Sequence, residues 1–166
     1  NNYYHMFYQY NPNSTFGGGL KYWGHATSQD LVRWQHQPIA LSPDQPYDKS
    51  GVWSGSASFI TTSDGRKQPI MIYTGVACIN GAVFCEEEGN SQPFPWRQQQ
   101  AYAFPSNSSD PLLKEWKKLR DNPILTTPPY SDFTGWRDPT TTFHIDQSEP
   151  LMLIGSGQKG MGGNTL

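Results

Sequence analysis

Arg137, Asp138 and Pro139 form a tripeptide whose residue types suit the binding of a hydroxyl-bearing ligand. A guanidinium group offers a rigid fork of N–H donors, and the adjacent carboxylate can accept hydrogen bonds from vicinal hydroxyl groups. The proline fixes its own φ angle and stiffens the backbone at this point. Taken alone, the tripeptide is explained as well by a turn in which Arg137 is only the surface counter-ion of Asp138.

An internal repeat favours the binding interpretation. Residues 51–75 and 135–155 each run from a Trp-containing strand through a phenylalanine to an apolar strand that begins with proline. The tryptophans that open these segments stand at positions 53 and 136, and a second pair of matching tryptophans stands upstream at 34 and 116. A unit of this length with about four strands fits a propeller blade with long loops better than a sandwich.

The repeat predicts where a site would form. Equivalent turns of successive blades meet around a central channel, so the starts of the leading strands are natural site formers. Trp53-Ser54 and Arg137-Asp138 occupy this equivalent position, and we expect them to lie close together. The alternative is a chance similarity between two hairpins.

Short runs of aromatic and β-branched residues, separated by Gly, Pro, Asn and Asp, predict an all-β fold. Ser63-Asp64-Gly65 predicts a hairpin turn, because glycine tolerates the positive φ that a tight turn requires. The predicted strands are Tyr3–Tyr10, Tyr22–Thr27, Val52–Thr61, Pro69–Thr74, Gln99–Phe104, Thr140–Ile145 and Leu151–Ile154.

Composition excludes several classes of protein. With 16% charged and 14% aromatic residues, the 166-residue chain is expected to bury a core. A net charge of -2 and the absence of a Lys/Arg run argue against nucleic acid and membrane partners, and no stretch reaches the roughly 20 apolar residues of a membrane span. Cys78 and Cys85 either form a local disulfide or remain two thiols.

The titratable residues outside the tripeptide give no catalytic set. His25 is interpreted as a structural histidine, and the other three histidines form no spaced ligand set. The Glu86-Glu87-Glu88 run is interpreted as a solvated loop. We predict no metal and no cofactor.

Four blocks in a fixed order carry a resemblance to a known family. They are Phe7–Pro12, Trp23–Ser28 with Asp30-Leu31 and Trp34, Trp53–Ser56, and Trp136–Pro139. Together they resemble glycoside hydrolase family 32. Two further segments, Ser109–Trp116 and Asp121–Ile124, resemble the plant-type invertases and fructan-active enzymes of that family.

The resemblance implies a five-bladed β-propeller, of which this chain would form about two blades plus part of a third. Residues 1–166 would be part of a single N-terminal catalytic domain, without the β-sandwich that follows in full-length members. The implied activity is hydrolysis of terminal β-fructofuranosides, sucrose or fructans, with retention of configuration. The implied location is secreted or vacuolar, and the implied partner is a small carbohydrate.

The resemblance also assigns roles to individual residues. Asp138 would hold fructose hydroxyls and stabilise the oxocarbenium-like transition state, and Arg137 would orient it. Gln9, Trp53 and Ser54 match positions that line the fructose subsite. Members often carry a tryptophan where this chain has Phe16, so the outer subsite is expected to differ or to use Phe16.

Both reacting carboxylates of the family, an aspartate in an Asn-Asp-Pro block and a glutamate in a Glu-Cys block, are absent from these residues. The chain is therefore interpreted as an internal fragment that is inactive alone. Two alternatives stay open: a fructosyltransferase of the same family, and a catalytically dead carbohydrate-binding relative. Related five-bladed glycosidases acting on arabinose or xylose match the blocks less well.

A prediction follows for the chain expressed by itself. Because a partial propeller exposes unpaired sheet edges and apolar blade faces, we expect aggregation or a molten state. Size-exclusion chromatography and thermal unfolding followed by near-UV circular dichroism would test this. A soluble monomer with one sharp, cooperative transition would contradict the fragment interpretation.

Overall fold

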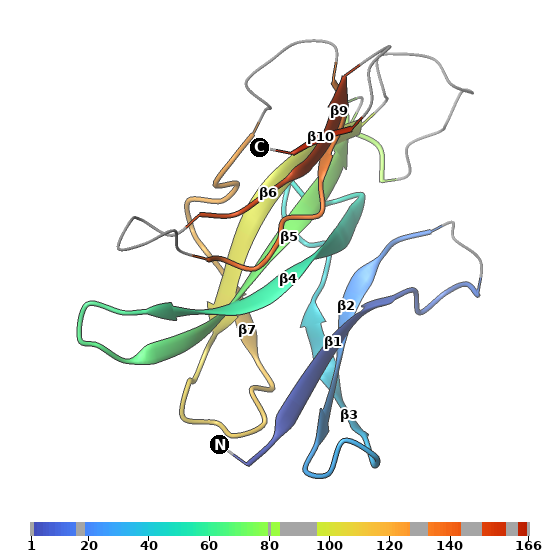
Figure 1. The fold of residues 1–166 in the computed structure, drawn as a ribbon. Coiled ribbons are helices and arrows are strands. Elements are labelled where there is room, and N and C mark those ends of the chain that lie inside the picture. Colours follow the sequence, from blue (N-terminus) through green and yellow to red (C-terminus); the bar gives the residue numbers. More distant parts are fainter. Residues whose placement is uncertain are drawn as a thin grey trace.

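The chain forms three antiparallel β-sheets in a computed structural model, which describes residues 2–15, 19–79, 81–83, 96–126, 133–143, 151–158 and 163–165 (Figure 1). No helix in these ranges has the length and apolarity needed to cross a bilayer. The expectation of an all-β chain is confirmed for the described residues.

The sheets follow one another along the chain. The first sheet has the order β1 (Tyr4–Tyr10), β2 (Tyr22–Ser28), β3 (Gln35–Leu41). The second has the order β4 (Gly51–Thr61), β5 (Lys67–Cys78), β6 (Trp96–Pro105), β7 (Trp116–Lys118). The third has the order β8 (Phe133–Arg137), β9 (Gly155–Gln158), β10 (Gly163–Thr165).

Two matching turns confirm the internal repeat. Leu31 and Leu113 both have positive φ angles, of 63° and 45°, which non-glycine residues seldom adopt. In each turn the indole N–H three residues later donates to the leucine carbonyl, from Trp34 at 3.2 Å and from Trp116 at 2.9 Å. A preceding aspartate carboxylate accepts backbone N–H groups in both turns.

These turns lead into β3 and β7, the outer strands of the first two sheets, so the two sheets are equivalent units. In the same alignment β1 corresponds to β5 and β2 to β6. The second sheet is thus a complete four-stranded blade. In the described residues the first and third sheets have three strands each, and the expected partial β-propeller is confirmed.

Most predicted strands are present with longer bounds, but those at the C-terminal end were wrong in detail. Of the predicted strand Thr140–Ile145, residues 140–143 are described. Phe143 forms an isolated bridge to Leu151, and the Thr140 N–H donates to the Leu153 carbonyl at 2.9 Å. The strand expected over Leu151–Ile154 instead begins at Gly155 and pairs with β8. The predicted hairpin at Ser63–Gly65 is confirmed, since Gly65 has a φ of 78° between the antiparallel β4 and β5.

An apolar core lies between the first and second sheets. Tyr73 and Met71 of β5 are fully buried there against Trp23 and Leu41 of the first sheet, and Val52 at the start of β4 completes the contact. Burial of such side chains is worth about 2 kcal/mol each. The first two blades are therefore held together mainly by hydrophobic packing.

On the opposite face of the second sheet, serine side chains form hydrogen bonds with residues 139 and 142. The Ser56 hydroxyl donates to the Pro139 carbonyl at 3.0 Å, and the Ser58 hydroxyl lies 3.0 Å from that of Thr142. Directed hydrogen bonds, unlike apolar contacts, fix the position of the next segment along the sheet.

A β-bulge shapes the start of β4. The register passes from Trp53↔Thr74 directly to Gly55↔Tyr73, so Ser54 has no partner on β5. At Gly55 a β-carbon would lie 2.7 Å from the Tyr73 α-carbon and would overlap the Ile72 carbonyl oxygen. Bulges of this kind turn a side chain out of the regular alternation, here that of Ser54.

Gly55→Ala is expected to destabilise the domain strongly, by about 3 kcal/mol or more, because the clash is with backbone atoms that cannot rotate away. Thermal unfolding of the complete protein would measure it. The control is Ala57→Gly, a change of one methyl group at an exposed position of the same strand, expected to cost about 1 kcal/mol or less. Equal midpoints for the two variants would contradict a close-packed bulge.

Candidate functional site

The start of β4 carries two of the predicted site residues. Trp53 is partly buried and its carbonyl accepts a hydrogen bond from the Trp23 indole N–H at 3.0 Å, while Ser54 is exposed on the bulge. The indole of Trp53 lies against Gly51, where a β-carbon would come within 2.9 Å of its Nε1 atom. The Lys21 ammonium lies 5.7 Å from the centre of the Trp53 ring.

Gln9 reaches the same place from the first sheet. It is exposed on β1, and its side-chain amide donates to the Val52 carbonyl at 3.2 Å. The Val52 N–H in turn donates to the Lys21 carbonyl at 2.9 Å. Both backbone groups of the residue before Trp53 are therefore tied to the first sheet, and Gln9 is fixed beside the start of β4.

Arg137 is the last residue of β8, and Asp138 follows it. Their side chains form an ion pair with 3.7 Å between Arg137 Nε and Asp138 Oδ2, and the side chains are 42% and 56% exposed. A single, long, exposed ion pair holds a carboxylate only weakly. The contact joins one guanidinium nitrogen to one carboxylate oxygen, and the orienting role that the family resemblance implies for Arg137 stays a prediction.

The backbone of Asp138 is held instead by Thr74 of β5. The Asp138 N–H donates to the Thr74 hydroxyl at 3.0 Å, and Asp138 has a φ of 61°. Thr74 also pairs directly with Trp53 across the β4–β5 ladder. Trp53, near the start of β4, and Asp138, directly after the end of β8, therefore both contact Thr74, so the two positions that the repeat equated lie close together.

Sequence reasoning missed the buried polar residues that support this meeting point. Thr74 and Gln100 are fully buried and Gln98 is 5% exposed. Gln100 Nε2 donates to the Trp136 carbonyl and Gln98 Oε1 accepts from the Trp136 N–H, both at 2.7 Å. A signal was available, because polar residues inside strands that bury both faces must find partners.

The resulting arrangement suits the binding of a small polyol. A half-exposed carboxylate follows β8, and Thr74 connects its backbone to the start of β4, where an indole, an amide side chain and an exposed serine hydroxyl lie. Carboxylate and amide oxygens accept hydrogen bonds from hydroxyl groups, and an aromatic ring supplies an apolar surface with little loss of side-chain entropy.

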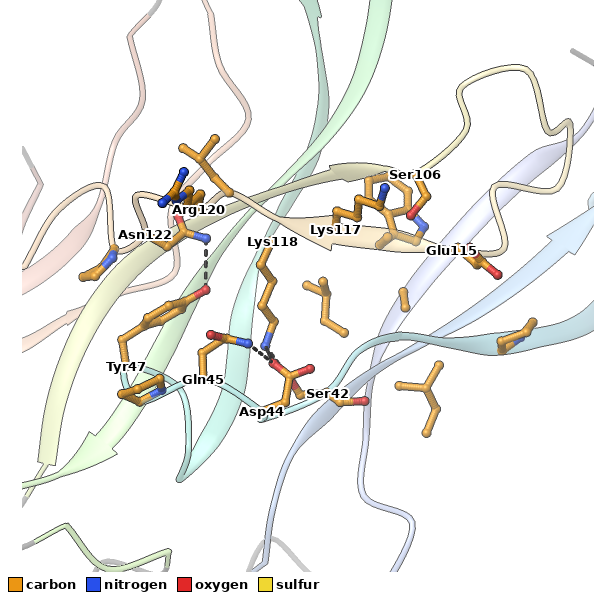
Figure 2. A pocket seen from close by; sticks show the side chains of 18 of the residues that line it. Ser42, Asp44, Gln45, Tyr47, Ser106, Glu115, Lys117, Lys118, Arg120 and Asn122 are labelled. Atoms are coloured by element: carbon orange, nitrogen blue, oxygen red, sulfur yellow. Dashed lines mark hydrogen bonds and ion pairs between the residues drawn. The ribbon is translucent and has the colours of Figure 1, made fainter.

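The hollow shown in Figure 2 lies elsewhere and contains none of the predicted site residues. It has a volume of about 1040 Å³ and is bordered by β3, β7 and the 42–47 segment. In its lining the partly buried Lys118 ammonium donates to Asp48 and Asp44, both at 2.6 Å, and to the Ser42 carbonyl. The Tyr73 hydroxyl also donates to Asp48, at 2.9 Å.

Burial raises the pKa of Asp48, and the nearby Lys118 ammonium opposes this rise. Burial likewise raises the pKa of Tyr73. Because the cation and the buried carboxylate are hydrogen-bonded to one another, the cluster ties β7 to the loop before β4. We assign it to structure, since a buried charge needs such partners.

The structural interpretation of His25 agrees with its environment. His25 is fully buried on β2, with its Nε2 3.0 Å from His5 Nδ1, and it stacks on Phe7 at 4.4 Å between ring centres. The pKa of His25 is lowered to about 4, mainly by burial and to a lesser extent by the charge of the neighbouring His5. Burial also lowers the pKa of His5, against smaller opposing effects of the Pro111 carbonyl and Asp110.

Some residues singled out in the sequence lie outside the described ranges, namely Phe16, Cys85 and Glu86–Glu88. Cys78 is disulfide-bonded, and Cys85 is the other cysteine of the sequence. The two alternatives for the cysteines are thereby decided in favour of a disulfide at Cys78.

Comparison with known proteins identifies relatives of the chain. The family profile described as "Glycosyl hydrolases family 32 N-terminal domain" matches residues 1–166. Beta-fructofuranosidase 1 of Zea mays is 46% identical over 138 residues, which are 83% of this chain and 18% of that protein. Acid beta-fructofuranosidase 1, vacuolar, of a Rosa hybrid cultivar is 43% identical over 92% of this chain and 22% of its own length.

Two solved structures resemble the chain over almost its whole length. Fructan 1-exohydrolase IIa from Cichorium intybus has a TM-score of 0.66 and 30% identity, covering 99% of this chain and 29% of that one. Sucrose-6-phosphate hydrolase from Lactobacillus gasseri has a TM-score of 0.70 and 25% identity over 99% of this chain and 28% of its own. The chain thus spans about a fifth of the length of the curated relatives and under a third of the solved ones.

The histidine pair predicts a pH-dependent stability. The pKa of His25 is lower in the folded state than its ordinary value of 6.5, so between pH 6.5 and about 4 only the unfolded state binds this proton. Stability is therefore lost as the pH falls through that window, by up to about 3 kcal/mol. His25→Gln should flatten the pH dependence of the unfolding free energy of the complete protein.

His36→Gln is the matched control, because it removes a histidine from β3 of the same sheet, where the imidazole bonds to the Tyr8 hydroxyl in an exposed contact. Between pH 6.5 and about 4 this variant should lose as much unfolding free energy as the wild type. If His25→Gln also loses that much, the buried histidine is not the source of the pH dependence.

Proposed function

Because the chain belongs to glycosyl hydrolase family 32, as part of its N-terminal domain, we propose that the complete protein hydrolyses terminal β-fructofuranosides such as sucrose and fructans. The observation that carries the proposal is the convergence of Trp53 and Asp138 on Thr74, with Gln9 bound to the preceding Val52. The names of the relatives, β-fructofuranosidases and a fructan exohydrolase, support the same substrate class.

In the proposed mechanism the configuration at the anomeric carbon is retained. Retention needs a carboxylate nucleophile and a second carboxyl group as acid and base, about 5 Å apart. Neither the Asn-Asp-Pro nor the Glu-Cys block occurs in these 166 residues, so we place both groups elsewhere in the complete protein. The chain alone is proposed to be inactive.

Asp138 is proposed as the transition-state stabiliser. Its carboxylate would accept hydrogen bonds from fructose hydroxyls, and its negative charge would favour the positive charge that develops on the sugar ring. A group of this kind lowers the barrier only if it is already in place, so the fixed backbone of Asp138 supports the assignment.

The other predicted site residues are proposed to bind the fructosyl unit. Trp53 would offer its indole as an apolar wall, while Gln9 and Ser54 would discriminate hydroxyl positions through hydrogen bonds. Arg137 is proposed to add a positive charge beside Asp138 in the site that binds the fructosyl unit. The domain is proposed to be a five-bladed propeller followed by a β-sandwich, as in full-length members of the family.

We propose the vacuole or the cell exterior as the location. Relatives from Rosa and Arabidopsis thaliana carry "vacuolar" in their names. Two N-glycosylation sequons, at Asn13 and Asn107, lie on exposed loops, which suits a protein of the secretory route.

The test is an assay of the complete protein with sucrose and with inulin, comparing wild type with Asp138→Asn. Asparagine keeps the size of the side chain and tolerates a positive φ, so the variant removes the charge without straining the backbone. We expect kcat to fall by about 10³-fold or more. Asp121→Asn, at an exposed position outside the site, should leave kcat unchanged.

Product analysis separates the alternatives. Equal release of glucose and fructose from sucrose supports hydrolysis, whereas glucose in excess of fructose, with longer oligosaccharides, would indicate a fructosyltransferase. A folded wild-type protein that binds fructosides but releases no sugar would overturn the proposal in favour of a dead relative.

A further inference from the structure

We infer that Thr74 is the residue that positions Asp138 for the proposed reaction, an inference that rests on the proposed function. Thr74 does not reach the ligand side of the site, because it is fully buried on β5. It acts through the backbone of Asp138, whose N–H donates to the Thr74 hydroxyl at 3.0 Å.

The direction of this hydrogen bond is fixed by its neighbours. Gln100 donates through Nε2 to the Trp136 carbonyl at 2.7 Å, so its Oε1 faces Thr74 as an acceptor. The one hydrogen of the Thr74 hydroxyl is therefore given to Gln100 Oε1, at 3.0 Å. The hydroxyl oxygen is left to accept from Asp138, and each bond in the chain requires the next.

The segment before Asp138 is held by the same strands. Gln98 Oε1 accepts from the Trp136 N–H at 2.7 Å, so both backbone groups of Trp136 are bound to glutamine side chains of β6. Arg137, the residue between, pairs with Gly155 of β9 instead. The backbone groups of residues 136 and 138 are bound by side chains of the second sheet, whereas residue 137 pairs with the third sheet. Backbone groups that face opposite sides in turn are typical of a β-strand.

Asp138 also needs this support because of its backbone angle. A φ of 61° is unfavourable for a residue with a β-carbon, and it persists only where the surroundings enforce it. On the other side of the residue, the carbonyl of the buried Pro139 is held by the Ser56 hydroxyl at 3.0 Å. Thr74 and Ser56 thus fix the chain on either side of the carboxylate.

The ion pair with Arg137 cannot replace Thr74. It is 3.7 Å long and exposed to solvent on both sides, whereas the Thr74 hydroxyl is excluded from water. Without the hydroxyl, the Asp138 N–H and Gln100 Oε1 would both lose their partners in a dry site. The backbone would then relax, and the carboxylate would move away from the sugar.

The test compares Thr74→Val with Thr74→Ser in the complete protein. Valine keeps the shape of threonine and removes the hydroxyl, while serine keeps the hydroxyl. We expect Thr74→Val to lower kcat by about 10- to 100-fold with KM changed less than about threefold, because a displacement near 1 Å has this effect on catalysis. Thr74→Ser should retain at least about half of the wild-type kcat.

Two further variants separate positioning from folding. Ser58→Ala removes a hydroxyl bond to Thr142 on the same face of the sheet, away from Asp138, and should lower the unfolding midpoint without changing kcat. Thr74→Val in the Asp138→Asn background should cause no further loss, since its effect acts through the carboxylate. If Thr74→Val does not fold, Thr74→Cys takes its place, with a weaker hydrogen-bonding group of similar size.

The outcomes are distinguishable. If the wild type is active, three results would overturn this inference alone. They are a normal kcat for Thr74→Val, a Thr74→Ser variant as impaired as Thr74→Val, and a further fall in kcat when Thr74→Val is added to Asp138→Asn. An inactive, folded wild type would overturn the proposed function instead.

Discussion

A buried polar group between two sheets must find a hydrogen-bond partner, and this requirement fixes the relation of the second sheet to the chain that follows it. The side chains of Thr74 and Gln100 and the Oε1 atom of Gln98 are such groups, on neighbouring strands of one sheet face. Their partners are backbone atoms of Trp136 and Asp138. A shift of the third sheet along the second would leave several of these groups unpaired at once.

The two faces of the second sheet therefore contact their neighbours through different kinds of interaction. On one face Met71 and Tyr73 pack on the first sheet, and this apolar contact contributes stability without a strong preference for one position. On the other face, where Ile70 and Ile72 are also buried, hydrogen bonds with defined directions favour one position of the third sheet. The candidate site lies at the end of this face.

The start of β4 shows how the two contacts combine. Its backbone is bound to the first sheet through Val52, and its neighbour Trp53 pairs with Thr74, which holds the third sheet. One short stretch of strand thus connects three sheets. The bulge after it, which requires Gly55, keeps Ser54 out of the ladder and exposed.

Several strands were predictable because their apolar residues alternate or run continuously, and the hairpin between β4 and β5 because of Gly65. β3 and β7 were missed for a common reason. They are outer strands with Gln, His or Lys side chains, so they lack the apolar pattern on which the prediction rests. Their pairing is decided by the turns before them, at Leu31 and Leu113.

By itself the sequence determined the all-β class, the repeat and the order of the blocks that contain Gln9, Trp53 and Asp138, because these depend on local residue types and on spacing along the chain. Only the tertiary structure decided what holds Asp138 in place. The sequence pointed to the adjacent Arg137, whereas the structure shows Thr74, which is 64 positions away. A hydrogen bond between a side chain and a distant backbone group depends on how two sheets pack. Every residue except proline has a backbone N–H, so the residue type of Asp138 does not reveal which side chain accepts from it.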